Sequence, residues 1–159
     1  MTELRRALPF LLLPLVLLLG GCGLLPAPFA SEPPGGAVAA DIAARREQWR
    51  AQGVASYEWR VAFSCECVLS GPTTITVVDG VATEITNPVI EVEPGDVAGF
   101  PLTVEALFED ALRTLADGGS VDATWDAATG LPRNMFLDRD RNAIDDELSV
   151  ELVAFQASG

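Results

Sequence analysis

Residues 56–68 alternate between apolar and polar side chains more cleanly than any other part of the chain. The odd-numbered positions from Tyr57 to Cys67 are apolar, and polar groups such as Glu58 and Arg60 lie between them. Successive side chains of a β-strand point to opposite faces, so the pattern predicts a long strand with one buried face. A chain with such a strand has to build a sheet that is packed on one side and open to solvent on the other.

The segment that follows, residues 73–86, predicts a hairpin that turns at Gly80. A three-residue loop that ends at this glycine places Val77 opposite Val81, whereas a two-residue loop would place Val77 opposite Ala82. The first register collects the apolar residues on one face, and a slip by one residue would exchange the faces. We therefore predict the bulged turn, with positive φ at Gly80.

Two further segments have helical spacing. In residues 38–52, Val38, Ile42 and Trp49 recur on one side of a predicted helix. Thr103 is the predicted N-cap of a second helix. The apolar stripe of that helix comprises Val104, Leu107, Phe108, Ala111, Leu112 and Leu115.

The C-terminal part predicts three more strands, at residues 120–126, 133–138 and 148–154. The order is then α-β-β-β-α-β-β-β, and only the segment around the second helix would suit a parallel crossover. The sequence predicts a single α+β domain, with a mainly antiparallel sheet of about six strands and two helices packed on one face.

The N-terminus has the pattern of a lipoprotein signal. Arg5 and Arg6 precede the apolar segment Ala7–Leu19, and Leu19-Gly20-Gly21-Cys22 resembles a processing site. The apolar run is shorter than the about 20 residues that span a bilayer. We therefore expect a signal peptide over residues 1–21 and a diacylglycerol on Cys22, which places the protein outside the cytoplasm on a bacterial cell membrane.

Residues 22–37 are rich in proline, glycine and small side chains, which is typical of a tether. The folded domain is expected over residues 38–157. After processing, the chain would carry 22 acidic and 8 basic side chains, a net charge of −14. Such a charge repels phosphate backbones, so the expected partners are the membrane, through the lipid, and an envelope protein rather than nucleic acid.

The chain contains no histidine and no lysine. This excludes Schiff-base lysines, phosphate-loop lysines, serine or cysteine nucleophiles activated by histidine, and imidazole metal sites. No pair of carboxylates is held by its spacing on one rigid element, so a hydrolase site cannot be argued either. We expect a protein that is not an enzyme.

Cys65 and Cys67 form the first candidate site. Outside the cytoplasm a neighbouring pair tends to oxidise. At positions i and i+2 of a strand their Cα atoms would lie near the ~7 Å upper limit for a disulfide, so closure needs a local bulge. A structural disulfide, buried free thiols and a redox function all stay open, while two thiols are too few for structural zinc.

The second candidate is the acidic loop over residues 138–147. Oxygen-bearing side chains occupy positions 1, 3, 5 and 9, as in a calcium loop, but position 6 is Ala143 and position 12 is Ser149. A solvated turn between two strands is the alternative. The calcium ligands in this hypothesis are Asp138, Asp140, Asn142 and Asp146.

Six short pieces, in order from about residue 45 to 155, together resemble an uncharacterised family of bacterial lipoproteins, domain of unknown function 6174. That resemblance implies a small secreted α+β domain and supplies no activity. The pieces are Trp49 with Tyr57, Cys65-Glu66-Cys67, Val77–Val81, Thr103–Phe108, Trp125–Pro132 and Ile144–Glu147.

Three functions follow as hypotheses. The first is a non-catalytic envelope lipoprotein that binds a partner and needs no cofactor. The second is a calcium-binding extracytoplasmic module that uses the acidic loop. The third, which we rank lowest, is a thiol redox protein that uses Cys65 and Cys67.

Overall fold

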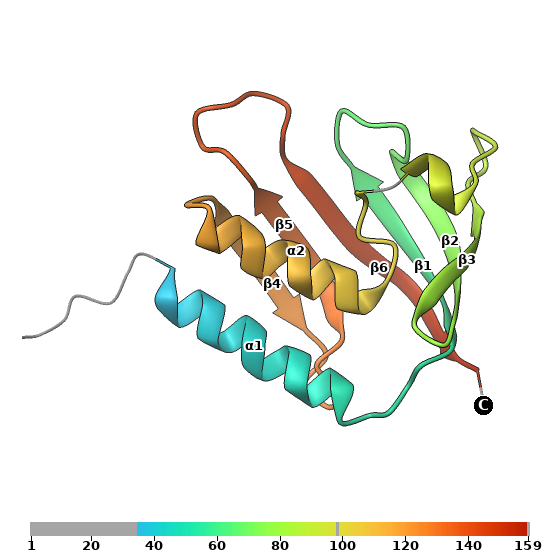
Figure 1. Ribbon diagram of the computed structural model, residues 1–159, viewed down its shortest axis with the longest axis horizontal. Coiled ribbons are helices and arrows are strands. Elements are labelled where there is room, and N and C mark those ends of the chain that lie inside the picture. The colour runs from blue at the N-terminus through green and yellow to red at the C-terminus, as the bar shows by residue number, and fades with distance from the viewer. Residues whose placement is uncertain (1–34, 98, 159) are drawn as a thin grey trace, which may run out of the picture. The chain divides into compact units, whose positions relative to one another are not determined.

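The computed structural model describes residues 35–97 and 99–158 of the chain. These residues form two α-helices, one 3-10 helix and six strands (Figure 1). In chain order they are α1 (Gly36–Arg50), β1 (Tyr57–Ser64), β2 (Gly71–Val78), β3 (Val81–Thr86), η1 (Pro94–Val97), α2 (Val104–Ala116), β4 (Ser120–Trp125), β5 (Pro132–Asp138) and β6 (Leu148–Ala157).

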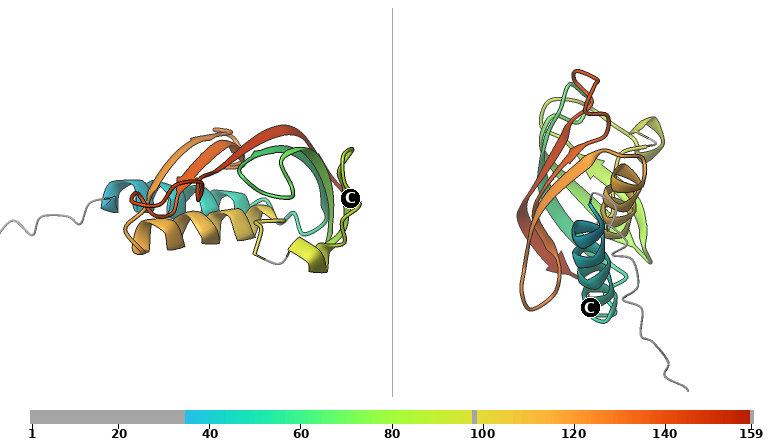
Figure 2. Two further views of the ribbon diagram at one scale, coloured as in Figure 1. Left: turned by 90° about the horizontal axis from the view of Figure 1, so that it is seen from above. Right: turned by 90° about the vertical axis from the view of Figure 1, so that its left-hand side faces the viewer.

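The six strands form one sheet in the order β3-β2-β1-β6-β5-β4, with every neighbouring pair antiparallel. Both helices lie on the same face of the sheet, as the two views in Figure 2 show. The predicted fold class, an α+β domain with an antiparallel sheet and two helices on one face, is confirmed. The segment through α2 carries the chain from the edge strand β3 to the other edge strand, β4.

The core lies between the sheet and α2. In β1 the side chains of Tyr57, Trp59, Val61 and Phe63 are buried, while the residues between them face the open side. Trp59 also donates its indole N–H to the carbonyl oxygen of Leu102, at 3.1 Å, so its one polar atom is satisfied inside the core. The predicted alternation therefore sets the buried face of the central strand.

That strand is shorter than predicted. It ends at Ser64, and residues 65–69 form bends and a turn instead of continuing to Val68. Leu69, which belongs to this connection, is itself fully buried. Burying Leu69 removes apolar surface from water, which fixes the connection against the core although it no longer belongs to the sheet.

The β2–β3 hairpin corrects the predicted register. Its loop has two residues, with positive φ at both Asp79 (49°) and Gly80 (80°), and Val77 lies opposite Ala82. Positive φ at Gly80 is as predicted, but the extra residue is Thr83, within β3, opposite the register shift between Thr76 and Val77 of β2. Because of this bulge Ile75 still faces Ile85 in the core. The turn residue Val81, predicted to point inward, is 63% exposed.

The second helix agrees with its predicted pattern. Thr103 is its N-cap, and its hydroxyl accepts a hydrogen bond from the Ala106 N–H at 3.0 Å. The buried face also includes Asp110 and Thr114, which the predicted apolar stripe left out. Their positions at i+3 and i+7 from Leu107 place them on the side of the helix that faces the core.

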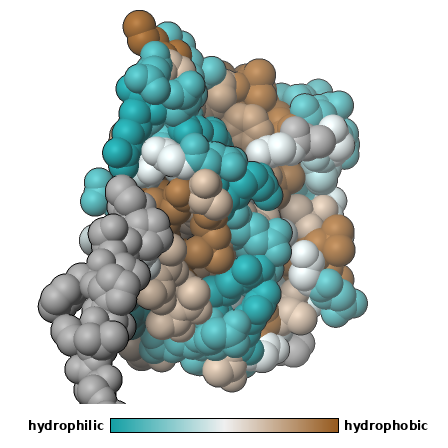
Figure 3. All heavy atoms as spheres, turned by 60° about the vertical axis from the view of Figure 1, so that its left-hand side comes forward, coloured by the Kyte–Doolittle hydropathy of each residue, from teal (hydrophilic) through white to brown (hydrophobic). Residues whose placement is uncertain are grey.

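The first helix, α1, has a narrow buried face. Only Ile42 and Trp49 are buried, and Val38, predicted to face inward, is 40% exposed. The helix begins at Gly36, two residues inside the segment predicted to be a tether. A separate surface feature lies beside this helix. On the side of the molecule shown in Figure 3, apolar residues gather in a hollow bordered by hydrophilic ones. A groove of about 310 Å³ between α1 and β4 is lined by Ala37, Val38, Asp41, Ile42, Val121, Asp122, Ala123 and Trp125.

Candidate functional site

An open cleft of about 390 Å³ lies at one end of the sheet. β1, β3 and β5 end here, and β2, β4 and β6 begin here, because neighbouring strands are antiparallel. The connection after β1, the loop between β5 and β6, and one side of α2 surround the cleft. Its lining residues are Cys65, Glu66, Cys67, Gly99, Phe100, Asp110, Arg113, Thr114, Asp117, Arg139, Asp145, Asp146, Glu147 and Leu148.

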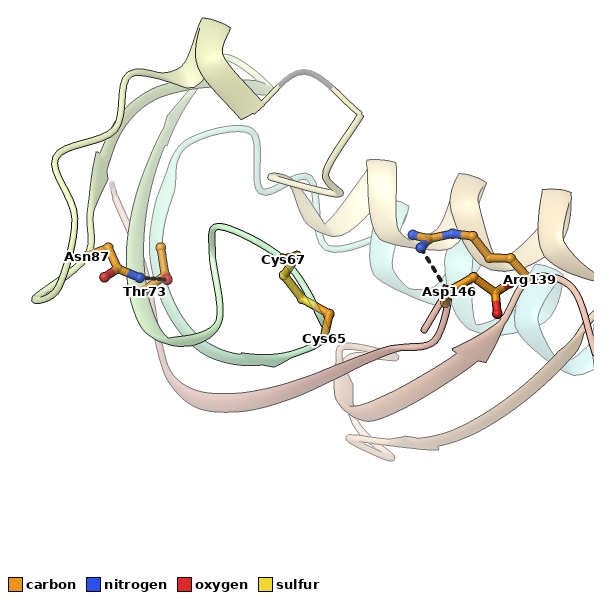
Figure 4. The surroundings of a disulfide bond; sticks show 6 residues. All are labelled: Cys65, Cys67, Thr73, Asn87, Arg139 and Asp146. Atoms are coloured by element: carbon orange, nitrogen blue, oxygen red, sulfur yellow. Dashed lines mark hydrogen bonds between the residues drawn. A yellow bond between two sulfur atoms is a disulfide. The ribbon is translucent and has the colours of Figure 1, made fainter. Parts of the chain in front are cut away.

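Cys65 and Cys67 are a close pair on one side of this cleft. They are joined as a disulfide, and their Cα atoms are 5.2 Å apart (Figure 4). The strand has already ended at Ser64, so the bent backbone brings the two Cα atoms closer than the ~7 Å of an extended i, i+2 pair. Both cysteines are half-buried and face the cleft, with the exposed Glu66 between them.

A partly buried ion pair connects the β5–β6 loop to α2. Arg139 donates to Asp110 Oδ2 at 2.7 Å, and the side chain of Asp110 is only 11% exposed. Arg139 also donates to the carbonyl oxygen of Asp146, at 3.4 Å, as Figure 4 shows. Arg113 lies 3.6 Å from the other carboxylate oxygen of Asp110. One buried carboxylate therefore binds both arginines of the cleft and positions the acidic loop.

Four residues of the acidic loop were predicted to be calcium ligands. In the structure their side chains form hydrogen bonds with other groups of the protein. Asp140 accepts hydrogen bonds from the backbone and side-chain nitrogens of Asn142, at 3.0 and 3.2 Å. Asp146 accepts from the Asp140 N–H at 2.5 Å. Asp138 ends β5 and accepts from the Ser120 hydroxyl at 3.4 Å.

These contacts match the alternative interpretation, a turn with local side-chain hydrogen bonds to the backbone. Among the described residues, no group of three or more Cys, Asp or Glu side chains is arranged to hold a metal ion. Asp146 lines the cleft, whereas Asp138, Asp140 and Asn142 do not. The structure thus brings only one of the four predicted ligands to the site, and calcium binding stays a prediction.

Most cleft carboxylates are not used by the fold. Glu66, Asp117, Asp145 and Glu147 are exposed, and none forms an ion pair with an arginine within residues 35–97 and 99–158. The lining carries six carboxylates and two guanidinium groups, both of which lie against Asp110. The cleft therefore presents negative charge to solvent.

Sequence reasoning missed the residues that α2 contributes to the cleft. Asp110 and Thr114 share the face that carries Leu107, and a polar residue within an apolar stripe was the available signal. Arg139 lies within the acidic loop that the sequence singles out, but it is not among the predicted ligands. Its pairing with Asp110 joins positions 29 residues apart, and no local pattern shows such a contact.

The opposite end of the sheet has polar groups that the fold itself uses. In the turn between β4 and β5, Asp126 Oδ1 accepts from Ala128 N, Thr129 N and the Thr129 hydroxyl at 3.0–3.1 Å, and Oδ2 pairs with Arg133 at 2.6 Å. Hydrogen bonds from Arg133 and then Thr129 lower the pKa of Asp126 to about 2. This carboxylate fixes the turn and is not offered to a ligand.

A second internal network fastens α1 to α2. Glu105 accepts hydrogen bonds from Arg46 and Arg50, and Arg46 also pairs with Glu109 at 2.7 Å. Burial by itself would raise the pKa of Glu105, but the bonds from Arg46 and Arg50 outweigh it and lower that pKa. These charged side chains therefore join α1 to α2.

The predicted lipid attachment site, Cys22, and the predicted signal peptide lie outside the described residues. Within the described residues, the structure has no helix that is both long enough and apolar enough to cross a membrane.

Comparison with known proteins gives one family. Residues 41–157 match the family described as a family of unknown function (DUF6174), and no curated protein matches the chain. The match begins within α1 and ends at the last residue of β6, so it spans the whole sheet and α2. The chain therefore belongs to this family of unknown function, DUF6174.

Proposed function

We propose that this protein is a lipid-anchored domain of the bacterial cell envelope. It binds a protein partner in the cleft between its disulfide loop (residues 65–70, the connection between β1 and β2) and its acidic loop. The processing pattern at Cys22 supports the anchor, and the paired Cys65 and Cys67 agree with an oxidising compartment outside the cytoplasm. The absence of histidine and lysine from the sequence supports a binding role over a catalytic one.

The observation that carries the binding proposal is the convergence of unused polar groups in one concave place. Glu66, Asp117, Asp145 and Glu147 come from three separate parts of the chain, and all are exposed around the same cleft. Clefts with a few converging polar groups are the common form of binding sites.

The charge of the cleft indicates the chemistry of the partner. Six carboxylates face two arginines, so a partner segment rich in arginine or lysine complements the site, and an acidic one is repelled. Phe100 adds an apolar wall that can pack against the stems of long basic side chains. We infer a basic, extended segment of an envelope protein as the ligand.

The anchor is tested by growing cells with labelled palmitate. The wild-type protein should carry the label and sediment with membranes, and Cys22→Ser should lose both properties. The Cys65→Ser/Cys67→Ser double variant keeps Cys22 and should keep the label. A protein that retains Met1, or that is unlabelled and soluble in the cytosol, would refute the anchor.

The cleft is tested by replacing single acidic residues with a photo-reactive amino acid in living cells. Glu66 and Asp145 are the cleft positions, and Glu84 and Glu151, exposed on strands away from the cleft, are matched controls. Crosslinks should form from the cleft positions only, and should be lost when the other exposed cleft carboxylates are changed to amides. Identical crosslinks from all four positions, or none from the cleft, would contradict the proposal.

A further inference from the structure

We propose that the Cys65–Cys67 disulfide is a thiol–disulfide exchange site, and that its reaction partner is a dithiol of another protein. This inference goes beyond partner binding, because it assigns a reaction to the cleft. It shares the extracytoplasmic location with the proposed function, but it does not depend on which protein the cleft binds.

The disulfide lies outside the strands of the sheet. β1 ends at Ser64 and β2 begins at Gly71, so both cysteines lie in the connection between the strands. The last pair of this ladder, Phe63 with Gly71, forms without them. A bond between residues two positions apart also closes a very short loop, and short loops constrain the unfolded chain least. The bond is therefore expected to add little to the stability of the fold.

The pair is accessible to an incoming thiolate. Both cysteines are half-buried and line the open cleft, so a partner can approach the sulfurs from solvent. The buried Leu69 anchors the same connection to the core. After reduction the two thiols would stay close together, because they are only two residues apart in the chain, and a high effective concentration favours their re-oxidation.

The exchange conserves atoms and electrons. A partner thiolate attacks one sulfur of the pair, a mixed disulfide forms, the Cys65–Cys67 bond breaks, and the released thiolate takes up a proton. The partner's second thiol then attacks the mixed disulfide, which leaves a disulfide in the partner and thiols on Cys65 and Cys67. Two electrons and two protons pass from the partner to this chain, and the reverse reaction with a partner disulfide restores the starting state.

The charge of the cleft gives the site a selectivity. Glu66 lies between the two cysteines, and Asp145 and Glu147 line the same cleft. These carboxylates repel anionic thiols such as glutathione. Arg113 and Arg139 do not offset them, because both arginines are paired with Asp110. A neutral or cationic dithiol should therefore react faster than an anionic thiol of equal reducing strength.

The first experiment titrates the purified full-length lipoprotein in detergent with dithiothreitol, counts thiols by alkylation and mass spectrometry, and follows the fold by near-ultraviolet circular dichroism. Two thiols should appear while the native signal persists, and oxidised dithiothreitol should remove them. The Cys65→Ser/Cys67→Ser variant should show neither change. A pair that resists reduction until the protein unfolds, a loss of fold on reduction, or thiols that never oxidise would each overturn the inference.

The second experiment compares reduction rates by glutathione and by dithiothreitol. In the Glu66→Gln/Asp145→Asn/Glu147→Gln variant the glutathione rate should rise about tenfold at low ionic strength and less in high salt. The dithiothreitol rate should stay within about twofold, and the matched Glu84→Gln variant should change neither. Equal effects on both reagents would refute the selectivity. Failure of the exchange would leave the photo-crosslinking result, and hence the binding proposal, intact.

Discussion

The two ends of the sheet use their polar residues in opposite ways. At the turn end, which contains the Asp126–Leu131 turn and the Asp79-Gly80 turn, polar groups bind one another or the backbone. At the cleft end, which contains the disulfide loop and the acidic loop, several carboxylates point to solvent with no arginine partner in the described part of the chain. Buried or satisfied polar groups specify a fold, whereas unsatisfied exposed ones are available to a ligand.

Two glycines with positive φ, one at each end of the sheet, differ in the space around them. Gly130 at the turn end has φ of +77°, and a Cβ built there would lie 2.5 Å from the Arg45 carbonyl oxygen of α1. Gly118 at the cleft end has φ of +93°, with open space around it. Both glycines relieve backbone strain, but only Gly130 also permits close packing of two elements.

The largest expected effect is that of Gly130→Ala. Left-handed backbone and the clash with α1 together should lower the free energy of unfolding by about 3 kcal/mol or more. Gly118→Ala, the matched control, should lower it by only about 1–2 kcal/mol, since strain is its single cost. Urea denaturation measures both. Equal losses in the two variants would show that the close approach of Gly130 to α1 adds no cost to the backbone strain.

Tyr57 tests burial at the turn end. Its hydroxyl accepts a hydrogen bond from the Val104 N–H at 2.9 Å, and burial raises the pKa of Tyr57 to about 12. Tyr57→Phe leaves this N–H unpaired and should destabilise the protein by about 1–3 kcal/mol.

The titration of the same residue is also directly visible, because the chain has one tyrosine. The stabilisation that Tyr57 provides should be complete below its ordinary pKa of 10.0 and disappear as pH rises towards about 12. Phenolate absorbance should report a midpoint near 12 in the folded protein and near 10 in urea. A midpoint near 10 in the native state would mean that Tyr57 is open to solvent.

Asp126 gives a smaller effect with a defined pH window. Its pKa falls from 3.8 to about 2 in the fold, so its stabilisation is complete above pH 4 and is lost as pH falls towards 2. The melting temperature of Asp126→Asn should be below that of the wild type at pH 7, and the two values should converge at pH 2. A constant difference across this range would exclude the charge on Asp126 as the cause.

The cleft carboxylates should have almost no effect on stability. Glu66→Gln, Asp145→Asn and Glu147→Gln, made singly, should each change the free energy of unfolding by less than about 0.5 kcal/mol, as is usual for exposed side chains. A loss above about 1 kcal/mol would assign these carboxylates to the fold and remove the contrast between the two ends.

Calcium is expected to have the smallest effect. The hypothesised ligands bond to one another and to the backbone, so millimolar calcium should leave the melting temperature unchanged. A bound calcium ion at 100 times its dissociation constant would add about 2.7 kcal/mol, which scanning calorimetry would detect easily. A rise that Asp140→Asn or Asp146→Asn abolishes would restore the calcium hypothesis.

Patterns carried by neighbouring residues predicted much of this fold. The alternation in β1, the Thr103 cap of α2 and the left-handed Gly80 depend on local geometry, and the structure confirms all three. The predicted hairpin loop was wrong because the extra residue lies inside β3, at Thr83, and not in the turn. A pattern of apolar residues indicates which side chains share a face. It does not indicate whether the extra residue of a bulged hairpin lies in the turn or in a strand.

The sequence by itself determined the class of the fold, the acidic character of the domain and the absence of histidine and lysine chemistry, because composition and periodicity act through each residue's own properties. Only the tertiary structure decided that the disulfide loop and the acidic loop meet beside α2. The position of the two loops depends on the partly buried Arg139–Asp110 pair and on the strand order of the sheet. Contacts between distant segments are decided by how all the elements pack together, and no single stretch of sequence contains that information.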